Sequence, residues 1–468
     1  MPHSYSLYNA LVKPFVHLRS SLASLDAETL ARTSGFLRRR PRKIPMADLL
    51  LGLCALAGES FLSLERIAAL IALAAQCPYS KQAFHQRLSE KLQHFLAAVA
   101  LRLFGQLSAP LQTQGAFKTF GRVLLHDSTV QSLPRRLAAV FPGSASQTSK
   151  NGAALKIQWV CDLLSGSLLH LSLSGFRRND QAAAGDVLNF LQPGDLVLRD
   201  LGYFSLPIFS QILSKGAFLL SRLRNGVLLR DPKTKKEIDL LRLLRRDGRL
   251  DQNVLVGADQ VPMRLVVLPV PQEVANQRRA RARSSRNASA PSAKRLALMN
   301  WSLFLTNVPP QVWSAEAVAQ IYRLRWRVEI IFKSWKSCLR LHELNCRSAD
   351  LVRLSVMLKL FYCLLTANCF NSLESLVGRT RHVSLLRLSR LMGQCGLLIS
   401  AILLQISPEK LLAHYLANHA SYEHRNDRKN FVQRLTALAS KLPRADASKF
   451  LLVGLPRGVG GRDGASRR

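Results

Sequence analysis

The sequence lacks the cysteine spacing of two common kinds of stabilised scaffold. Its eight cysteines are scattered along 468 residues, and no two of them form a C-x2-C pair. Disulfide frameworks need paired cysteines in a short secreted chain, and zinc ribbons need C-x2-C pairs. The sequence therefore predicts neither, and a reducing cytoplasm is the expected compartment.

Long apolar runs are missing too. One long stretch without a charged residue, Leu391 to Pro408, is interrupted by Gly, Gln and Pro. A membrane-spanning helix needs about 20 consecutive, mostly apolar residues, so this stretch is expected to form a buried helix. No secretory signal is recognisable before the first predicted helix, and no repeat of solenoid length occurs. Neither a membrane protein nor a repeat protein is expected.

Acidic residues are scarce. Asp and Glu number 29 against 66 Lys and Arg, which gives a formal net charge of +37. Such an excess favours a polyanionic partner, because neutralised phosphates release counterions and add affinity that is independent of base sequence. A membrane surface is the rival partner, but membrane-binding chains collect their charge on one segment. Here the charge is spread along the chain, which favours nucleic acid.

Two of the few aspartates follow short apolar runs. Val123 to Leu125 precede Asp127, and Leu196 to Leu198 precede Asp200. A single Asp after a strand is commonly a turn or cap residue. A buried strand that ends in Asp before a turn can also deliver a carboxylate to the end of a sheet, where ligands collect.

A third acidic residue, Glu329, belongs to a segment with helical periodicity. Tyr322, Arg325, Glu329 and Lys336 follow the spacing Y-x2-R-x3-E-x6-K, and on a helix they lie within a stripe about 60° wide that also holds Lys333. Apolar residues occupy the opposite side, as in a helix that packs on a core. An ordinary amphipathic helix with solvated ion pairs is the alternative interpretation.

Together, Asp127, Asp200 and Glu329 form a candidate metal-binding triad. Proteins hold Mg²⁺ through a few carboxylates, several waters and the phosphate oxygens of the substrate. Two such ions, about 3.5 to 4 Å apart, can activate a water or a 3′ hydroxyl and stabilise the leaving oxygen of an in-line displacement.

The segments HDSTVQSLP and RDLGYF and the Y-R-E-K helix resemble the DDE transposases of bacterial insertion sequences, specifically the insertion-sequence-four family with its YREK signature. The resemblance covers about residues 120 to 340. It implies an RNase H-like core, two Mg²⁺ ions that Mn²⁺ can replace, and cut-and-paste movement of a DNA element. It also implies functional residues: Asp127, Asp200 and Glu329 as catalytic metal ligands, and Tyr322, Arg325 and Lys336 as residues that hold phosphates at the end of the element. Lys333, on the same side of the helix, is a further candidate for DNA contact.

The apolar pattern from about 120 to 220 predicts an α/β region in the order typical of such a core. The expected strands are 123–127, 155–164, 167–175, 196–200 and 217–223, with helices near 180–191 and 206–213. Asn179 and Asp180 are expected to cap the first of these helices and not to bind metal.

The whole chain is expected to be an α/β protein whose RNase H-like catalytic core is interrupted by a β-rich insertion and flanked by helical N- and C-terminal regions. The expected segments are a helical DNA-end-binding domain (1–115), the first part of the core (116–222), the insertion (223–312), the YREK helix of the core (313–345), a helical C-terminal region (346–453) and a disordered tail (454–468).

Two further regions are candidates for DNA contact. A helix, a short turn and a second helix capped by Ser80 are expected before residue 95, and the exposed side of the second helix would carry Lys81, Gln82, His85 and Gln86. A plain helical hairpin is the alternative. The insertion carries an Arg-rich run with Arg278, Arg279, Arg281, Arg283 and Arg286. A solvated face or a linker is the alternative there.

Trp301 closes the insertion, 21 residues before Tyr322. In similar transposases an aromatic residue at this place stacks on a flipped base during hairpin formation at the end of the element, which is physically reasonable. The alternative is a Trp on the buried face of a strand, shared with Leu303 and Leu305.

The sequence thus predicts a Mg²⁺-dependent transposase of the bacterial cytoplasm, associated with the nucleoid. Its expected partners are double-stranded DNA, both transposon ends and target, and a second copy of the chain in a synaptic complex. A transposase-derived DNA-binding protein without catalysis and an RNase H-like nuclease that only hydrolyses DNA are the alternatives.

Overall fold

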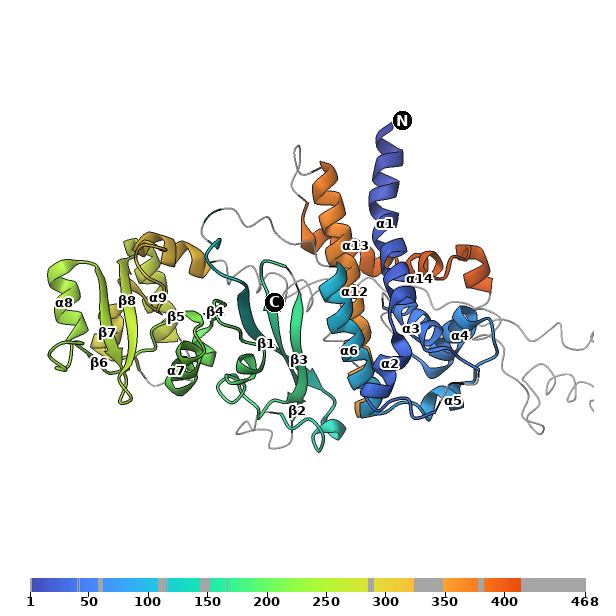
Figure 1. Ribbon diagram of the computed structural model, residues 1–468, viewed down its shortest axis with the longest axis horizontal. Helices are drawn as coiled ribbons and strands as arrows, with labels where there is room; N and C mark the ends of the chain where they lie inside the picture. Colours follow the sequence, from blue (N-terminus) through green and yellow to red (C-terminus); the bar gives the residue numbers. More distant parts are fainter. Residues whose placement is uncertain are drawn as a thin grey trace, which may run out of the picture. The chain divides into compact units, whose positions relative to one another are not determined.

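The structure is a computed structural model (Figure 1). It describes residues 2–39, 41, 43–57, 62–107, 115, 117–143, 152–165, 167–284, 290–323, 348–377 and 383–413. Residues 1–415 form one unit and 416–468 form a second, which lies outside the described residues.

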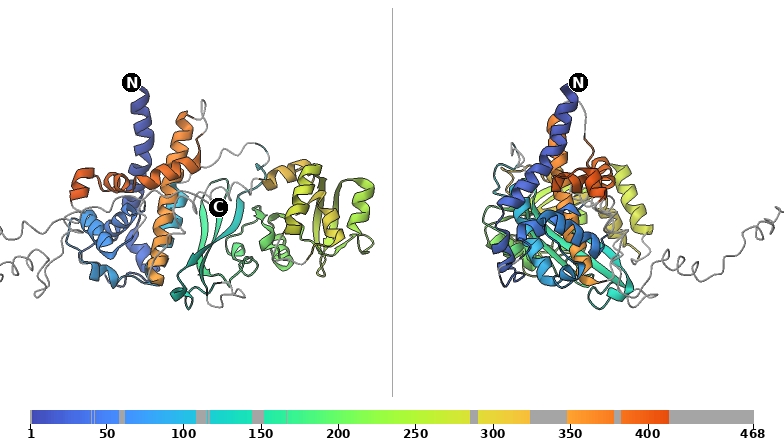
Figure 2. Two further views of the ribbon diagram at one scale, coloured as in Figure 1. Left: turned by 180° about the vertical axis from the view of Figure 1, so that it is seen from behind. Right: turned by 90° about the vertical axis from the view of Figure 1, so that its right-hand side faces the viewer.

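Helices from the two ends of the first unit pack together. The N-terminal ones are α1 (Pro2–Ser24), α2 (Ala27–Thr33), α3 (Met46–Ala55), α4 (Leu64–Ala75), α5 (Lys81–His85) and α6 (Glu90–Leu107), and the C-terminal ones are α12 (Ala349–Val377), α13 (Leu385–Gln394) and α14 (Gly396–Leu404). Helix α12 contacts α1 and α6, and α14 contacts α3 (Figure 2). Segments that are distant in sequence therefore share one helical core.

Nine strands form one mixed sheet in the order β3-β2-β1-β4-β5-β9-β8-β7-β6. The strands are β1 (Val123–Leu133), β2 (Ala153–Asp162), β3 (Leu168–Gly175), β4 (Leu196–Arg199), β5 (Phe218–Arg222), β6 (Leu229–Arg230), β7 (Leu250–Val256), β8 (Val261–Pro269) and β9 (Trp301–Thr306). Strands β1, β4 and β5 run parallel to one another, and every other pair is antiparallel.

Short helices connect the strands: η1 (Arg135–Leu137), η2 (Asp186–Asn189), η3 (Leu201–Tyr203), α7 (Leu206–Ser214), α8 (Leu240–Asp247), α9 (Gln272–Ser284) and α10 (Ala293–Leu298). The expected helix near 206–213 is confirmed as α7. The expected helix over 180–191 is wrong, because this stretch holds turns and the single 3-10 turn η2.

The central strands are buried on both faces. Along β1, Val123 and Leu125 belong to the core that the sheet shares with the helical layer, whereas Leu124 belongs to the core on the other side. Likewise, Leu196 and Val197 of β4 lie in different cores. Parallel strands covered on both faces are continuously apolar, which explains why they stand out in the sequence.

Among the residues that the structure describes, no single helix is long and apolar enough to cross a membrane. One pair of helices, Arg387–Gln394 and Gly396–Leu404, has the length and composition of a membrane span when the two are taken together, but the chain bends by 74° between them.

Candidate functional site

Two aspartates lie next to each other on parallel strands. The register of β1 against β4 ends with the pair His126 and Arg199. Asp127, still within β1, and Asp200, the first residue after β4, come next. Neighbouring strands are about 4.8 Å apart, and both aspartates are half-buried. The fold therefore brings together two carboxylates that are 73 positions apart in the sequence.

Each carboxylate accepts a hydrogen bond from a backbone amide that follows it in the chain. The Ser128 amide donates to Asp127 Oδ1 at 2.7 Å. The Gly202 amide lies 3.4 Å from Asp200 Oδ2, where Asp200 caps the 3-10 helix η3. These contacts fix the direction in which each carboxylate leaves its strand.

The expected end of the first strand at Asp127 is wrong. Strand β1 continues to Leu133, since its antiparallel partner β2 stays paired from Asp162 to Ala153. The parallel partner β4 ends at Arg199, and Asp127 is therefore the residue at which β1 loses one neighbour. Loss of the parallel neighbour, not the end of the strand, makes room beside Asp127.

The start of the Y-R-E-K segment reaches the same strand end. Residues 315–323 are helical, and Tyr322 is 6% exposed. Its hydroxyl donates to the Arg199 carbonyl oxygen at 3.3 Å, and its ring packs on Phe304. The helix thereby meets β4 one residue before Asp200. The remaining predicted site residues of the motif, Arg325, Glu329, Lys333 and Lys336, lie outside the described residues.

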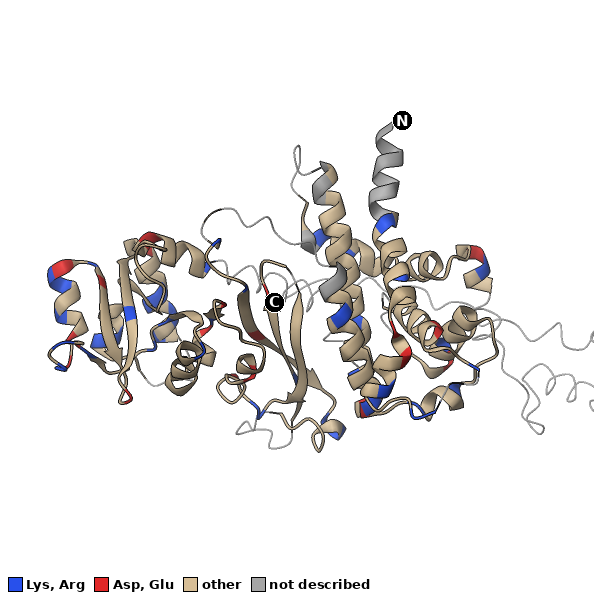
Figure 3. Ribbon diagram, in the orientation of Figure 1, with Lys and Arg blue, Asp and Glu red and all other residues tan. Residues whose placement is uncertain are grey.

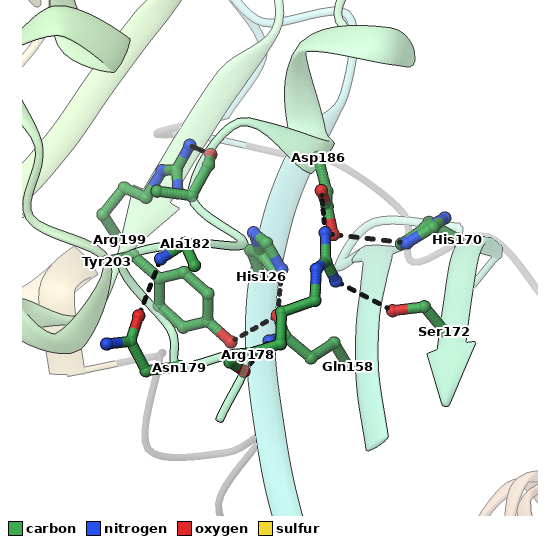
Figure 4. A network of polar contacts seen from close by, with 11 residues as sticks. His126, Gln158, His170, Ser172, Arg178, Asn179, Ala182, Asp186, Arg199 and Tyr203 are labelled. Atoms are coloured by element: carbon green, nitrogen blue, oxygen red, sulfur yellow. Dashed lines mark hydrogen bonds and ion pairs between the residues drawn. The ribbon is translucent and has the colours of Figure 1, made fainter. Parts of the chain in front are cut away.

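His126 and Arg199, which directly precede the two aspartates, belong to a network of polar contacts (Figure 4). His126 Nε2 lies 3.2 Å from Gln158 Oε1, to which the Tyr203 hydroxyl donates at 3.5 Å. Burial, together with the charge of Arg199, holds the pKa of His126 well below its ordinary value. Burial also raises the pKa of Tyr203. Both side chains are consequently uncharged at neutral pH.

Arg199 is a buried cation directly before Asp200. Its side chain is fully buried, and one guanidinium nitrogen donates to the Ala184 carbonyl oxygen at 2.6 Å. Burial lowers the pKa of Arg199 to about 10, so the group is still charged at neutral pH. Its positive charge lies behind the strand end that carries the carboxylate of Asp200.

The prediction that Asn179 and Asp180 cap a helix is wrong, because residues 180–185 form turns and no α-helix. Asn179 Oδ1 accepts from the Ala182 amide at 2.8 Å and so caps a turn. Asp180 instead binds the Ser128 hydroxyl and the Lys156 ammonium. Sequence alone could not reveal this, because Ser128 and Lys156 reach Asp180 only through sheet pairing.

The donor chemistry of the pair fits a hard divalent cation. Two adjacent carboxylates with partial solvent access are the kind of oxygen ligands that Mg²⁺ takes. Among the described residues, no group of three or more His, Cys, Asp or Glu side chains could enclose a metal ion. A third protein ligand would therefore come from elsewhere in the chain, and Glu329 is the predicted one.

The N-terminal candidates lie on a shorter helix than expected. Ser80 caps α5, as predicted, but α5 ends at His85 and α6 begins at Glu90. Lys81 pairs with Glu65 of α4 at 2.7 Å. The side chains of all four predicted contacts are exposed: Lys81, Gln82, His85 and Gln86. Their contact with DNA stays a prediction.

The Arg-rich run divides into two kinds of residue. Arg278 donates to the Trp301 carbonyl oxygen at 2.9 Å and to Ser302 Oγ at 3.0 Å, so it fastens α9 to β9. Arg279 binds Asn276, Asn300 and the Leu296 carbonyl oxygen. In contrast, Arg281 and Arg283 are exposed. DNA contact is a prediction for all four, and the exposed pair is better placed to make it. Arg286 lies outside the described residues.

Trp301 combines features of both interpretations. It is half-buried at the start of β9 and packs against the core cluster that also contains Leu250 and Val267. Its Nε1 donates to the Gly248 carbonyl oxygen at 2.7 Å. It also lines an open pocket of about 380 Å³ whose walls include Arg249, Gln272 and Asn300. The indole is thus anchored at its nitrogen and accessible from the pocket.

One basic element was missed in the sequence. The insertion was predicted to be β-rich, but its residues 240–247 form α8, capped by Asp239. Leu240 and Leu244 are buried, while Arg242, Arg245 and Arg246 are exposed, and basic residues mark this helix in Figure 3. The i, i+4 spacing of the leucines after a capping Asp was the available signal.

Comparison with known proteins shows the family to which the chain belongs. A family model described as "Transposase DDE domain" matches residues 118–365, more than half of the chain. The matched range begins before β1 and ends within α12, so it contains both aspartates and the Y-R-E-K segment. The chain belongs to this family, and it is a DDE transposase of an insertion sequence.

Relatives include transposases of several insertion sequences. The chain is 28% identical over 353 residues to the transposase for insertion sequence element IS231D of Bacillus thuringiensis subsp. finitimus, covering 70% of this chain and 72% of that one. It is 24% identical over 294 residues to the transposase for IS1151 of Clostridium perfringens, covering 57% and 61%. Over 94 residues it is 35% identical to the putative transposase InsL for IS186A of Escherichia coli strain K12, covering 20% and 25%. The predicted family is confirmed.

Proposed function

We propose that the protein binds the ends of its insertion sequence and catalyses cut-and-paste transposition, with hydrolysis at the ends followed by strand transfer. The observation that carries this proposal is the register of β1 and β4, which makes Asp127 and Asp200 neighbours. Carboxylates in this arrangement suit an in-line displacement at phosphorus.

The catalytic core is proposed to be RNase H-like. Its support is the order β3-β2-β1-β4-β5, in which β1, β2 and β3 are antiparallel and β4 and β5 run parallel to β1. Strands β6, β7 and β8 then represent the β-rich insertion, which joins the same sheet through β9. The insertion separates Asp200 from the Y-R-E-K segment in sequence.

Asp127, Asp200 and Glu329 would hold two Mg²⁺ ions, or Mn²⁺ in their place. When bound, the metal ions activate a water or a 3′ hydroxyl and stabilise the leaving oxygen. The protein contributes the position of the carboxylates. Asp127 is directed by the Ser128 amide and Asp200 by the turn at Gly202.

Side chains around the carboxylates are proposed to grip the DNA end. Arg325, Lys333 and Lys336 would contact phosphates. The buried Tyr322 would fix the position of their helix against Arg199, since its hydroxyl binds the carbonyl oxygen there. The net charge of +37 supports a large phosphate interface. Exposed residues on α5, α8 and α9 are candidates for its outer parts.

Trp301 is proposed to stack on an extruded base, since its ring faces an open pocket. Two copies of the chain would hold the two ends in a synaptic complex. Both statements depend on the end-binding activity and are tested with it.

The experiment uses the full chain and a linear DNA fragment that spans its gene and the flanking sequence, with Mg²⁺ and a target plasmid. The proposal predicts cleavage at both element ends and joining of the freed 3′ ends to the plasmid. Binding without cleavage would support the non-catalytic alternative. Cleavage without joining would support the nuclease alternative. Asp200→Asn is the control that should bind the ends but neither cut nor join them.

A further inference from the structure

A third aspartate lies behind the carboxylate pair. Asp180 follows β3, and its Oδ1 accepts a hydrogen bond from Ser128 Oγ at 2.6 Å. The same oxygen is 2.7 Å from Lys156 Nζ. Its other oxygen faces Gly202, because a Cβ built on that glycine would lie 3.0 Å from Asp180 Oδ2. One carboxylate therefore touches both strand β1 and the turn that follows β4.

The same two segments, β1 at Ser128 and the turn at Gly202, supply the amides that contact Asp127 and Asp200. Ser128 follows Asp127 and gives its amide to that carboxylate at 2.7 Å. Gly202 follows Asp200 by two residues, and its amide faces that carboxylate at 3.4 Å. A shift of Asp180 would therefore move Ser128 and Gly202, and with them the amides that contact Asp127 and Asp200.

The position of Asp180 is itself fixed. The side chain of Lys156 is 5% exposed, so its ammonium is buried against the Asp180 carboxylate. Removing Asp180 alone would leave the buried ammonium of Lys156 without this carboxylate. Gly202 is required for the close approach on the other side, since a methyl group there would push on the carboxylate.

We propose that Asp180, held by Lys156, is a positioning residue that sets the separation and direction of Asp127 and Asp200 and thereby the affinity of the site for divalent cations. The inference rests on the proposed metal-dependent function. Asp180 acts through Ser128 and Gly202 and is not itself a metal ligand in this account.

The test compares two double variants of the full chain, because each removes the buried ammonium together with the acid. Lys156→Met/Asp180→Asn keeps an acceptor for Ser128, whereas Lys156→Met/Asp180→Ala removes it. Mn²⁺ binding is followed by water-proton relaxation, with Asp127→Asn as the baseline for a damaged site. The Mg²⁺ concentration for half-maximal end cleavage and the melting temperature are measured alongside.

The alanine double variant should bind Mn²⁺ at least tenfold more weakly and need at least tenfold more Mg²⁺. The asparagine double variant should have an Mn²⁺ affinity and an Mg²⁺ requirement close to those of the wild type. Gly202→Ala should resemble the alanine double variant. Equal Mn²⁺ affinity in the wild type and the alanine double variant would overturn the proposal.

A matched control is present at the other end of the same strands. Arg122 and Asp195, one residue before β1 and β4, form an ion pair at 2.6 Å. Arg122→Met/Asp195→Asn should lower the melting temperature with Mn²⁺ affinity unchanged. An equal loss of Mn²⁺ affinity in this control would show that general loosening of the strands, not Asp180, sets the affinity.

The inference and the proposed function fail in different ways. If the wild-type protein binds Mn²⁺ but cuts no DNA, the proposed function fails, while the comparison of Mn²⁺ affinities still decides the role of Asp180. If the wild-type protein cuts DNA and the alanine double variant keeps full Mn²⁺ affinity, the inference about Asp180 fails alone.

Discussion

The hydroxyl of Tyr322 donates to the carbonyl oxygen of Arg199, one residue before Asp200. This bond ties the start of the Y-R-E-K segment to the last residue of β4, directly before Asp200. Tyr322 is also 6% exposed, which leaves its ring little access to DNA. Tyr322, Arg325 and Lys336 were predicted to contact phosphates. The first of them, Tyr322, joins its helix to the end of β4.

Tyr322→Phe should therefore act through the position of the helix. Loss of this bond should cost about 0.5 to 1.5 kcal/mol of unfolding free energy and lower the cleavage rate several-fold, with end binding nearly unchanged. Denaturant unfolding and end cleavage, measured on the same preparation, check this. A lower salt slope of DNA binding with unchanged stability would instead favour a direct phosphate contact.

Arg325 and Lys336 are expected to contact phosphates directly. Arg325→Ala and Lys336→Ala should each reduce the salt slope of end binding by about one counterion and weaken formation of the complex with the ends. Titration of labelled end DNA at several salt concentrations measures the slope. Reduced thermal stability with an unchanged slope would favour an ordinary solvated helix.

The Arg-rich run should separate into structural and DNA-contacting residues. Arg278 is hydrogen-bonded to β9, so Arg278→Ala should cost about 1.5 to 3 kcal/mol of unfolding free energy. Arg281 is exposed, so Arg281→Ala should leave stability within about 0.5 kcal/mol and lower the salt slope of DNA binding. The reverse outcome for this pair would contradict the assignment.

Trp301 offers a test of base stacking against packing. Trp301→Ala should impair hairpin formation or its resolution and leave first-strand nicking nearly normal, since stacking contributes about 1 to 3 kcal/mol per base. Trp301→Phe removes the bond to Gly248 but keeps a ring, and it is the matched control. Nicked and hairpin products are assayed side by side with a melting curve. Equal loss of both products with a lowered melting temperature would leave Trp301 a core residue.

Apolar runs revealed much of the sheet because its central strands are buried on both faces. Strand β4 and helix α7 lie where the sequence predicts them. The extension of β1 beyond Asp127 was not visible, since it depends on pairing with β2. The short α5 was overestimated for a related reason: the helical pattern continues into α6, and only the turn before Glu90 separates them.

The sequence was sufficient to predict the two aspartates of the site but not the contacts behind them. Asp127 and Asp200 each follow an apolar run that the sequence displays, so their delivery to one strand end could be expected. The contacts of Asp180 could not, because its partners Ser128 and Lys156 lie on strands whose register forms only in the folded sheet. The hydrogen bonds from Arg278 to β9 could not be predicted either, because a run of arginines does not show which of them bind carbonyl oxygens.

Glu329 is the predicted third ligand. Glu329→Gln should abolish cleavage while end binding is retained, since the amide keeps the shape of the side chain but loses the charge that a hard cation needs. Mobility-shift and cleavage assays on one DNA end check this. A variant that cleaves at the wild-type rate would remove Glu329 from the site.

Asp127 and Asp200 are proposed to share a divalent-metal site. Whether they do can be tested by changing the metal that each position prefers. Asp127→Cys and Asp200→Cys should each bind the element ends but lose cleavage with Mg²⁺, which prefers oxygen ligands. Each should regain cleavage with Mn²⁺, which accepts a thiolate more readily, whereas Asp127→Asn and Asp200→Asn should stay inactive with either metal. Cleavage by either asparagine variant at a near wild-type rate with Mg²⁺ would contradict the account.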